Sequence, residues 1–388
     1  MTPAIDRPFL QDLLVALVRI NSINPSLVPG APGEAEIGAY VRGIMQQVGL
    51  QVHTLEPEPG RISVVGRLPG GDGRSLMINA HYDTVGVDGM SDPFSAKVRD
   101  GKLYGRGAYD MKGSLAAQIG AAKALIDAGL TLGGDLLIAA VADEEYASIG
   151  TADLLNHFHT DGAIVTEPTT LQVCLAHKGF IWMQVETVGR AAHGSRFDLG
   201  IDANMRMGRF LKELDGLEQE LRRRAAHPLV GPPSLHAATI AGGTELSIYS
   251  ARCRLEIERR TVPGESAAEI VAEMQEIIDH LSAEDPTFVA TLKTLLVRKP
   301  FEIAPEAAIV QAVDQSGEQF LGRFPSHVGE TPWMDSALLA DAGIETVVIG
   351  PHGAGAHASE EWVSLDSVVD LASILAETAI RYCGVLEP

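Results

Sequence analysis

Cysteine is scarce in this sequence, and its few cysteines form no recognisable pattern. Cys174, Cys253 and Cys383 are the only three, and they lie far apart. An odd number at such spacing matches neither a disulfide framework nor a zinc-thiolate site. We therefore expect three reduced, buried thiols, and we expect any metal ligands to be histidines and carboxylates.

Basic residues are also in short supply. The chain of 388 residues has 30 Lys and Arg against 51 Asp and Glu, which gives a formal net charge of −21. An acidic surface attracts neither nucleic acid nor an anionic membrane. We therefore expect neither as a partner, and we place most of the excess charge on the solvated surface.

Long apolar runs are missing as well. No run reaches the roughly 20 residues that a membrane-spanning helix requires. Near the start of the chain, Asp12 and Arg19 interrupt the apolar residues of 9–20. That segment predicts an amphipathic helix rather than a signal peptide. The sequence thus predicts a soluble, cytoplasmic protein.

What the sequence does contain is an ordinary globular share of hydrophobic residues, 46%, with a regular alternation of patterns. Helical periodicity alternates with short β-rich runs through the first part of the chain. The predicted helices are 9–20, 34–48 and 114–129, and the predicted strands are 62–68, 75–80, 135–141 and 162–165. This order favours an α/β domain with helices around a mixed, mainly parallel sheet. Ligands of such sheets bind beyond the carboxyl ends of the strands.

The pattern changes near residue 177 and returns near residue 296. Between these points we predict strands at 180–188, 236–241, 248–260 and 287–295 and helices at 203–223 and 267–282. After them come helices at 306–317, 335–342 and 365–382 and a strand at 346–349. The sequence therefore predicts an α/β domain of residues 1–176 and 296–388, interrupted by an inserted α+β sandwich, ferredoxin-like in order, at 177–295.

Acidic and histidine residues cluster at the predicted strand ends and in two loops. The clusters are His81-Tyr82-Asp83, Asp110 in the glycine-rich stretch 105–113, Asp143-Glu144-Glu145, Glu167, and His357 in 355–361. Each alone also fits an ordinary turn or a solvated acidic loop, and the glycine-rich stretch lacks both the dinucleotide and the Walker patterns. Together they offer nitrogen and oxygen ligands that suit zinc, cobalt or manganese.

In this order the motifs resemble one family of enzymes over nearly the whole chain. The motifs are His-Tyr-Asp-Thr-Val at 81–85, Gly-Arg-Gly-Ala-Tyr-Asp-Met-Lys-Gly at 105–113 and the Asp-Glu-Glu of 143–145. The family is the co-catalytic zinc metallopeptidases that include acetylornithine deacetylase, succinyl-diaminopimelate desuccinylase, aminoacylase and glutamate carboxypeptidase. The resemblance implies two divalent metal ions, expected to be Zn²⁺, and a cis peptide bond between Asp110 and Met111.

The resemblance also assigns roles to these residues. One metal would be bound by His81, Asp110 and Glu167, and the other by Asp110, Glu145 and His357. Asp83 would orient His81, since a carboxylate that accepts the second imidazole N–H fixes the ring. Glu144 would act as the general base on a water that bridges the metals. The reaction would be hydrolysis of the amide bond of a small N-acyl-amino acid or short peptide.

Three further residues are implied in substrate binding and assembly. His193 of the inserted domain would stabilise the oxyanion in the active site of a partner subunit, so that domain is expected to serve as a lid and to form a homodimer. Arg260 would bind the substrate carboxylate, as an arginine fork suits. However, Ser247 stands where the family has an accompanying asparagine. The backbone of Gly355 is expected to approach the substrate.

Two alternatives stay open at this point. A dipeptidase or carboxypeptidase would use the same metal centre, because the acyl pocket decides between these reactions and no motif here identifies that pocket. A catalytically inactive binding protein would need a broken ligand set, whereas all five ligands and Glu144 are present.

Overall fold

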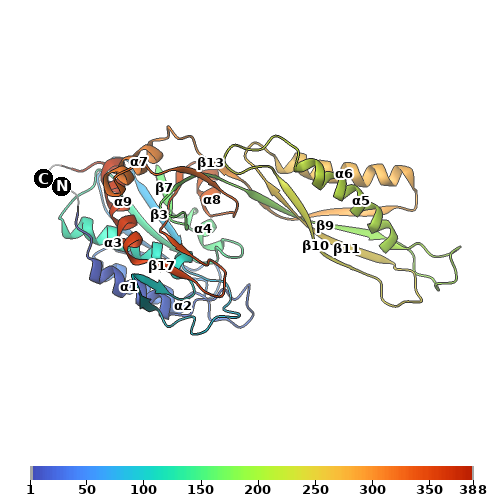
Figure 1. Ribbon diagram of the computed structural model, residues 1–388, viewed down its shortest axis with the longest axis horizontal. Helices are drawn as coiled ribbons and strands as arrows, with labels where there is room; N and C mark the ends of the chain where they lie inside the picture. The colour runs from blue at the N-terminus through green and yellow to red at the C-terminus, as the bar shows by residue number, and fades with distance from the viewer. Residues whose placement is uncertain (1–2, 387–388) are drawn as a thin grey trace. The chain divides into compact units, whose positions relative to one another are not determined.

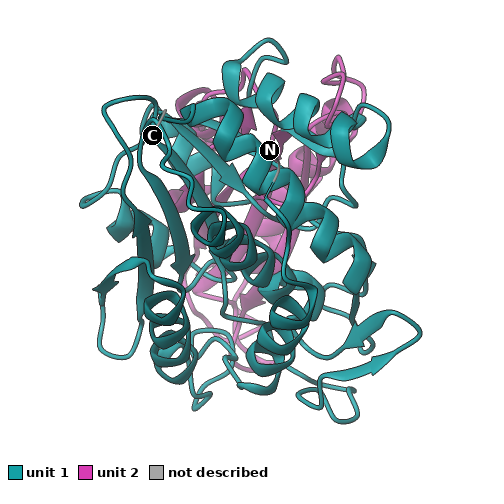
Figure 2. Ribbon diagram, turned by 90° about the vertical axis from the view of Figure 1, so that its left-hand side faces the viewer, with its two compact units in different colours: residues 1–175, 303–328, 334–388 teal, residues 176–302, 329–333 magenta. Residues whose placement is uncertain are grey.

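The computed structural model describes residues 3–386. They form two compact units, which Figure 2 colours separately. Unit 1 contains the chain up to residue 175, residues 303–328 and the chain from residue 334, and unit 2 contains residues 176–302 and 329–333. The inserted part of the predicted fold class is thus present, and its predicted bounds of 177–295 stay a prediction. The catalytic and lid roles assigned to the two regions stay predictions.

The main sheet has nine strands in the order β1-β2-β6-β3-β7-β15-β8-β13, and β14 pairs with β8. Its strands are β1 (Gln51–Leu55), β2 (Ser63–Leu68), β3 (Leu76–His81), β6 (Leu136–Val141), β7 (Gly162–Val165), β8 (Val173–His177), β13 (Phe301–Glu302), β14 (His327–Glu330) and β15 (Glu345–Val348). The mixed sheet expected from the sequence is confirmed, and its four central strands, β6, β3, β7 and β15, pair in parallel. Strands β3 and β6 are buried along their whole length, as parallel strands with both faces covered should be.

Helices pack against this sheet in unit 1 (Figure 1). The described helices of unit 1 are α1 (Arg7–Arg19), α2 (Ala35–Val48), α3 (Gly113–Asp127), α4 (Ile149–Leu154), α7 (Ala308–Leu321), α8 (Ser336–Asp341) and α9 (Leu365–Cys383). A kinked segment, η1 (Ala108–Lys112), precedes α3, and its Asp110 and Met111 have non-helical backbone dihedrals. Small side chains let α3 lie buried against α1, α9 and β3. The three cysteines are buried and free, as predicted.

A second, short sheet of unit 1 joins segments that lie far apart in sequence. Its order is β16-β17-β5-β4, with β4 (Lys97–Arg99), β5 (Lys102–Tyr104), β16 (Gly353–Ala354) and β17 (Trp362–Ser364). Pairing of β17 with β5 brings the segment that precedes Asp110 beside the segment that carries His357. The sequence pattern did not predict these strands, because two or three residues are too few to show a hydrophobic period.

Unit 2 has an antiparallel sheet in the order β10-β11-β9-β12. Its elements are β9 (Gly179–Val188), α5 (Ala203–Leu221), β10 (Ser234–Gly242), β11 (Arg252–Thr261), α6 (Ala267–Glu284) and β12 (Val289–Arg298). Alternate residues of β9 and β11, among them Met183, Val185 and Leu255, point into one core with the apolar faces of α5 and α6. This is the expected α+β sandwich. None of the helices in residues 3–386 is long and apolar enough to cross a membrane.

Candidate metal centre

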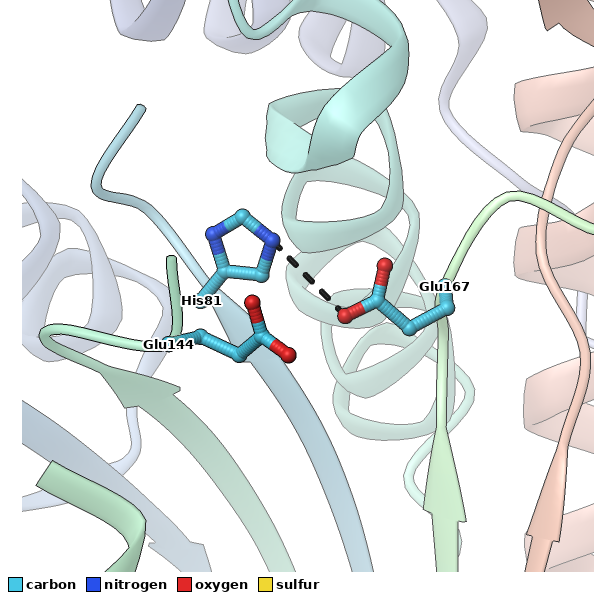
Figure 3. Close-up of side chains that lie close together, drawn as sticks. All are labelled: His81, Glu144 and Glu167. Carbon is cyan, nitrogen blue, oxygen red and sulfur yellow. Dashed lines mark ion pairs between the residues drawn. The ribbon is translucent and has the colours of Figure 1, made fainter. Parts of the chain in front are cut away.

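The ends of three neighbouring strands bring the first polar groups together. His81 is the last residue of β3, Glu167 follows β7 by two residues, and Glu144 follows β6 by three. Because β3 lies between β6 and β7 in the sheet, these side chains converge at one edge (Figure 3). His81 Nε2 lies 3.7 Å from Glu167 Oε1. One oxygen of Glu144 lies within 4.8 Å of both of these groups.

Asp110 lies between the two predicted histidine ligands. Its Oδ1 is 3.1 Å from His81 Nε2, and its Oδ2 is 3.3 Å from His357 Nε2. The residue belongs to η1, which follows Gly107, a glycine with a φ of 76° whose added Cβ would lie 2.7 Å from the Thr84 side chain. The cis peptide bond expected between Asp110 and Met111 is present. Each carboxylate oxygen of Asp110 therefore faces a different histidine, which is the arrangement that a bridging ligand needs.

His357 completes a second group of donors. Its Nε2 lies 3.0 Å from Glu145 Oε2 in addition to its contact with Asp110. The structure thus brings all five predicted ligands together. The groups of three whose ligand atoms lie within 4.8 Å of one another are His81, Glu144 and Glu167, and His81, Asp110 and Glu145. The division into two sets that share Asp110, with His81 and Glu167 in one and Glu145 and His357 in the other, stays a prediction.

The distances within these sets test whether cations fit. Metal–ligand bonds of 2.0–2.1 Å in a tetrahedral site place neighbouring ligand atoms about 3.3 Å apart. The four distances from His81 Nε2 and His357 Nε2 to the neighbouring carboxylate oxygens, from 3.0 to 3.7 Å, lie close to this value. The donors are imidazoles and carboxylates without a thiolate, a set that suits zinc, cobalt and manganese. The residues therefore fit two cations that share one carboxylate.

Crowding of buried acids shapes the electrostatics of this site. Burial, together with the neighbouring charges of Asp110 and Glu145, raises the pKa of Glu167 to about 8 against the effect of His81. Burial and the charge of Glu167 also raise the pKa of Glu144 well above its ordinary value. Hydrogen bonds to Asp110 and Glu145 raise the pKa of His357 to about 10. In the absence of cations, protons are therefore expected to neutralise part of the cluster.

His81 is oriented by the backbone of Asp83 more closely than by its side chain. Nδ1 of His81 lies 3.0 Å from the Asp83 carbonyl oxygen and 3.6 Å from the nearer carboxylate oxygen. The Asp83 carboxylate instead accepts the backbone N–H groups of Glu144 and Glu145, at 3.1 and 3.3 Å. Asp83 therefore links the end of β3 to the acidic loop after β6.

Sequence reasoning missed a buried polar network beneath this loop. The Arg61 guanidinium donates to both carboxylate oxygens of Glu34 at 2.8 Å, and it also donates to Asp143 and Asn24. Asn24 and Glu34 are fully buried, and Arg61 is nearly so. The four residues come from separate segments, and the one local signal was the Asn-Pro pair at 24–25, which indicates only a turn.

The residues predicted to bind substrate lie in different units. His193 and Arg260 belong to unit 2. His193 is exposed, and its Nδ1 contacts Ser195 Oγ at 2.9 Å, while Arg260, on β11, donates to the Thr331 carbonyl and lies over the Phe180 ring. Their roles at the metal centre stay predictions.

Gly355 belongs to unit 1 and has a φ of 86°. A Cβ added there would lie 1.9 Å from the Glu360 carbonyl oxygen. Closure of its own loop therefore explains this glycine, and an approach of its backbone to the substrate stays a prediction.

Comparison with known proteins decides the family. Residues 77–381, well over half of the chain, match Peptidase family M20/M25/M40. The chain belongs to this family. It is 27% identical to an N-formyl-4-amino-5-aminomethyl-2-methylpyrimidine deformylase of Bacillus subtilis, over 92% of this chain and 91% of that protein. It is 29% identical to an acetylornithine deacetylase of Myxococcus xanthus, over 81% of this chain and 82% of that protein.

Solved structures confirm the fold of this M20 family member. A tripeptidase from Staphylococcus aureus has a TM-score of 0.77 at 19% identity, over 96% of this chain and 98% of that one. The YXEP protein of Bacillus subtilis, described as a dinuclear metal-binding peptidase from the M20 family, has a TM-score of 0.77 at 15% identity, over 98% and 99%. Membership confirms the predicted class, a metal-binding hydrolase of amide bonds.

Proposed function

We propose that this M20 family member is a two-metal deacylase that removes the acyl group from a small N-acyl-amino acid. The observation that carries the proposal is the position of Asp110, whose two oxygens face His81 and His357 at 3.1 and 3.3 Å. A carboxylate placed in this way supports two cations side by side. Zinc is the expected metal, because the donors are imidazole nitrogens and carboxylate oxygens.

The bound cations would polarise the scissile carbonyl and acidify a water molecule. The proton transfers would be carried out by a side chain of the protein. Glu144 lies within 4.8 Å of the proposed ligands His81 and Glu167 and could join them around a cation. We assign it to neither ligand set, which leaves its carboxylate free to move protons. Its carboxylate is therefore placed to take the proton of the attacking water and to deliver a proton to the leaving nitrogen. Asp83 holds the backbone of Glu144 in place.

The relatives favour deacylation over the cleavage of peptides. The two relatives compared by sequence are named for the removal of a formyl and of an acetyl group. The peptidases compared by structure share too little sequence to carry more than the fold. A dipeptidase or carboxypeptidase is therefore the second candidate, because the same metal centre would serve it.

The proposal that the substrate is an amino-acid derivative with a carboxylate rests on Arg260. Its guanidinium is partly exposed at the end of a strand of unit 2, where a carboxylate could reach it. The named substrate of the deformylase relative carries amino, aminomethyl and methyl groups and no carboxylate. We retain the N-acyl-amino acid as the proposed substrate. We further propose a homodimer in which His193 acts in the partner's site, and the expected cytoplasmic location stays a prediction.

The test is a panel of acetyl, formyl, succinyl and aminoacyl derivatives, run with zinc, cobalt and manganese on the wild type and on Glu144→Gln. We expect turnover of acyl derivatives by the wild type. We expect turnover by Glu144→Gln to fall by roughly 10²–10⁴-fold with two metals retained. Glu145→Gln serves as the matched comparison, since it should lose metal. Turnover by Glu144→Gln close to that of the wild type would reject the general-base assignment.

A further inference from the structure

Glu361 follows His357 by four residues, yet its side chain contacts the other ligand loop. Its carboxylate accepts the backbone N–H groups of Gly107, Tyr109 and Asp110, at 3.0, 2.9 and 3.1 Å. The side chain of Glu361 is fully buried. One of the three donors is the backbone of the bridging residue itself, so this carboxylate fixes the loop from which Asp110 projects.

Arg106, from the loop that precedes Asp110, also donates hydrogen bonds to the loop of His357 and Glu361. Its Nη1 donates to the Glu361 carboxylate at 2.7 Å, and its Nη2 donates to the carbonyl of Ala358, the neighbour of His357, at 3.0 Å. The Gly105 N–H also donates to the Glu361 carbonyl, at 3.1 Å. Arg106 is 3% exposed, so a charged pair shielded from water joins the two loops. Buried pairs of this kind are expensive to break from one side.

The two metal positions depend on this contact to different degrees. His81 and Glu167 project from the ends of buried strands, so the sheet holds them. His357 lies in a loop, has a φ of 60°, and its side chain is 54% exposed. Its position therefore depends on what anchors the loop, and the contacts of Arg106 and Glu361 tie this loop to the segment that precedes Asp110.

We propose that Glu361 is a positioning residue that clamps the Asp110 loop to the His357 loop and so sets the metal position shared by Asp110, Glu145 and His357. The proposal rests on the two-metal function proposed above. It predicts that loss of the Glu361 carboxylate weakens this position far more than the one formed by His81, Asp110 and Glu167. Residues that hold metal ligands in place typically change metal affinity by 10–100-fold when mutated.

The experiment titrates the metal-free full-length protein with Zn²⁺ by calorimetry and with Co²⁺ by visible absorption. The variant is Glu361→Gln, whose amide nitrogen would face backbone donors. The control is Glu360→Gln, which removes the same charge from the exposed neighbouring residue. We expect two binding steps in the wild type and in the control. In Glu361→Gln we expect one step to be kept and the other to weaken on the order of 10–100-fold, with a reduced second increment of Co²⁺ absorption.

Folding is checked by the melting temperatures of the metal-free proteins. If Glu361→Gln does not fold, Arg106→Lys replaces it, because lysine cannot reach both Glu361 and Ala358, and the same selective weakening is expected. Two steps of wild-type affinity in either folded variant, or equal weakening of both steps, would overturn the clamp. Fewer than two cations bound by the wild type would instead overturn the two-metal function, and the clamp with it.

Discussion

The side-chain amide of Asn24 donates a hydrogen bond of 2.8 Å to the carboxylate of Asp83. The same nitrogen lies 3.0 Å from Asp143 Oδ1, and Asn24 is fully buried. Asn24 carries no charge, but its amide donates hydrogen bonds to two buried carboxylates that would otherwise face each other without a donor between them. Because Asp83 in turn holds the loop that bears Glu144 and Glu145, the amide supports the metal centre from below.

Replacement of Asn24 by aspartate tests this support. Asn24→Asp would place a third carboxylate against Asp83 and Asp143 and would remove both amide hydrogen bonds. We expect the free energy of unfolding of the metal-free protein to fall by about 1–3 kcal/mol, the usual cost of leaving buried polar groups unsatisfied, and metal affinity to fall with it. Denaturant unfolding and metal titration measure both. Asn156→Asp, at an exposed position, is the control, and equal stability of the two variants would contradict the argument.

The side chains of the candidate metal centre could be predicted from local patterns, whereas the buried residues that contact them could not. His81 ends a recognisable buried strand, Glu144 and Glu167 follow two others within three residues, and the sheet order brings these strand ends together. Asn24 and Arg61 sit in irregular segments, where contacts depend on the folding of the whole unit. Such contacts leave no periodic signal in a single sequence.

The secondary structure shows the same difference between features that are local in the sequence and features that depend on distant contacts. Helices such as α5 and α9 and strands such as β7 were predicted within a few residues, because amphipathic periodicity and apolar runs are local properties. Strand β8 was missed because it directly precedes the inserted unit, and only its pairing with β15 and β13 reveals it as part of the main sheet. Glu361 lies in the predicted segment 355–361 but was given no role from the sequence, because its partners lie some 250 residues earlier in the chain.

Metal binding is expected to release protons. In the metal-free protein the pKa of Glu167 is about 8 and that of His357 about 10, so both groups hold protons at pH 7. Ligands must lose these protons to bind a cation, so apparent affinity should rise with pH between 6 and 8, by about tenfold per pH unit for each proton released. Calorimetry in buffers of different ionisation enthalpy counts the protons. Glu167→Gln should release about one fewer, and binding heats that do not depend on the buffer would refute the prediction.

Glu34 should make the stability of the metal-free protein depend on pH. Burial and the nearby charge of Asp83 raise the pKa of Glu34 to about 7 from an ordinary value of 4.5, against the lowering effect of Arg61. Because the pKa is higher in the folded than in the unfolded protein, the proton on Glu34 stabilises the folded state. This contribution to the free energy of unfolding is complete below pH 4.5 and is lost as pH rises through 7, with a slope of at most about 1.4 kcal/mol per pH unit.

Glu34→Gln removes this titration while it keeps a hydrogen-bond acceptor for Arg61. The variant should therefore gain stability relative to the wild type as pH rises from 5 to 8. Denaturant unfolding across this range measures the difference. Glu36→Gln, at an exposed position two residues later in the first turn of α2, should follow the wild type. A constant difference between Glu34→Gln and the wild type would show that Glu34 does not titrate in this range.

The proposed role of Arg260 can be tested with substrates that carry or lack a carboxylate. Its guanidinium lies 5.4 Å from the centroid of the Phe180 ring and 3.8 Å from Glu258, so the stem is held while the fork keeps some exposure. Arg260→Met preserves much of the packing and removes the charge. If the arginine binds a substrate carboxylate, KM for N-acyl-amino acids should rise by roughly 10–100-fold, as for the loss of a charged hydrogen bond of about 1.5–3 kcal/mol. Turnover of N-acyl amines without a carboxylate should change little. Arg254→Met, on the same strand but exposed, is the control, and equal losses on both kinds of substrate would assign Arg260 to packing rather than to carboxylate binding.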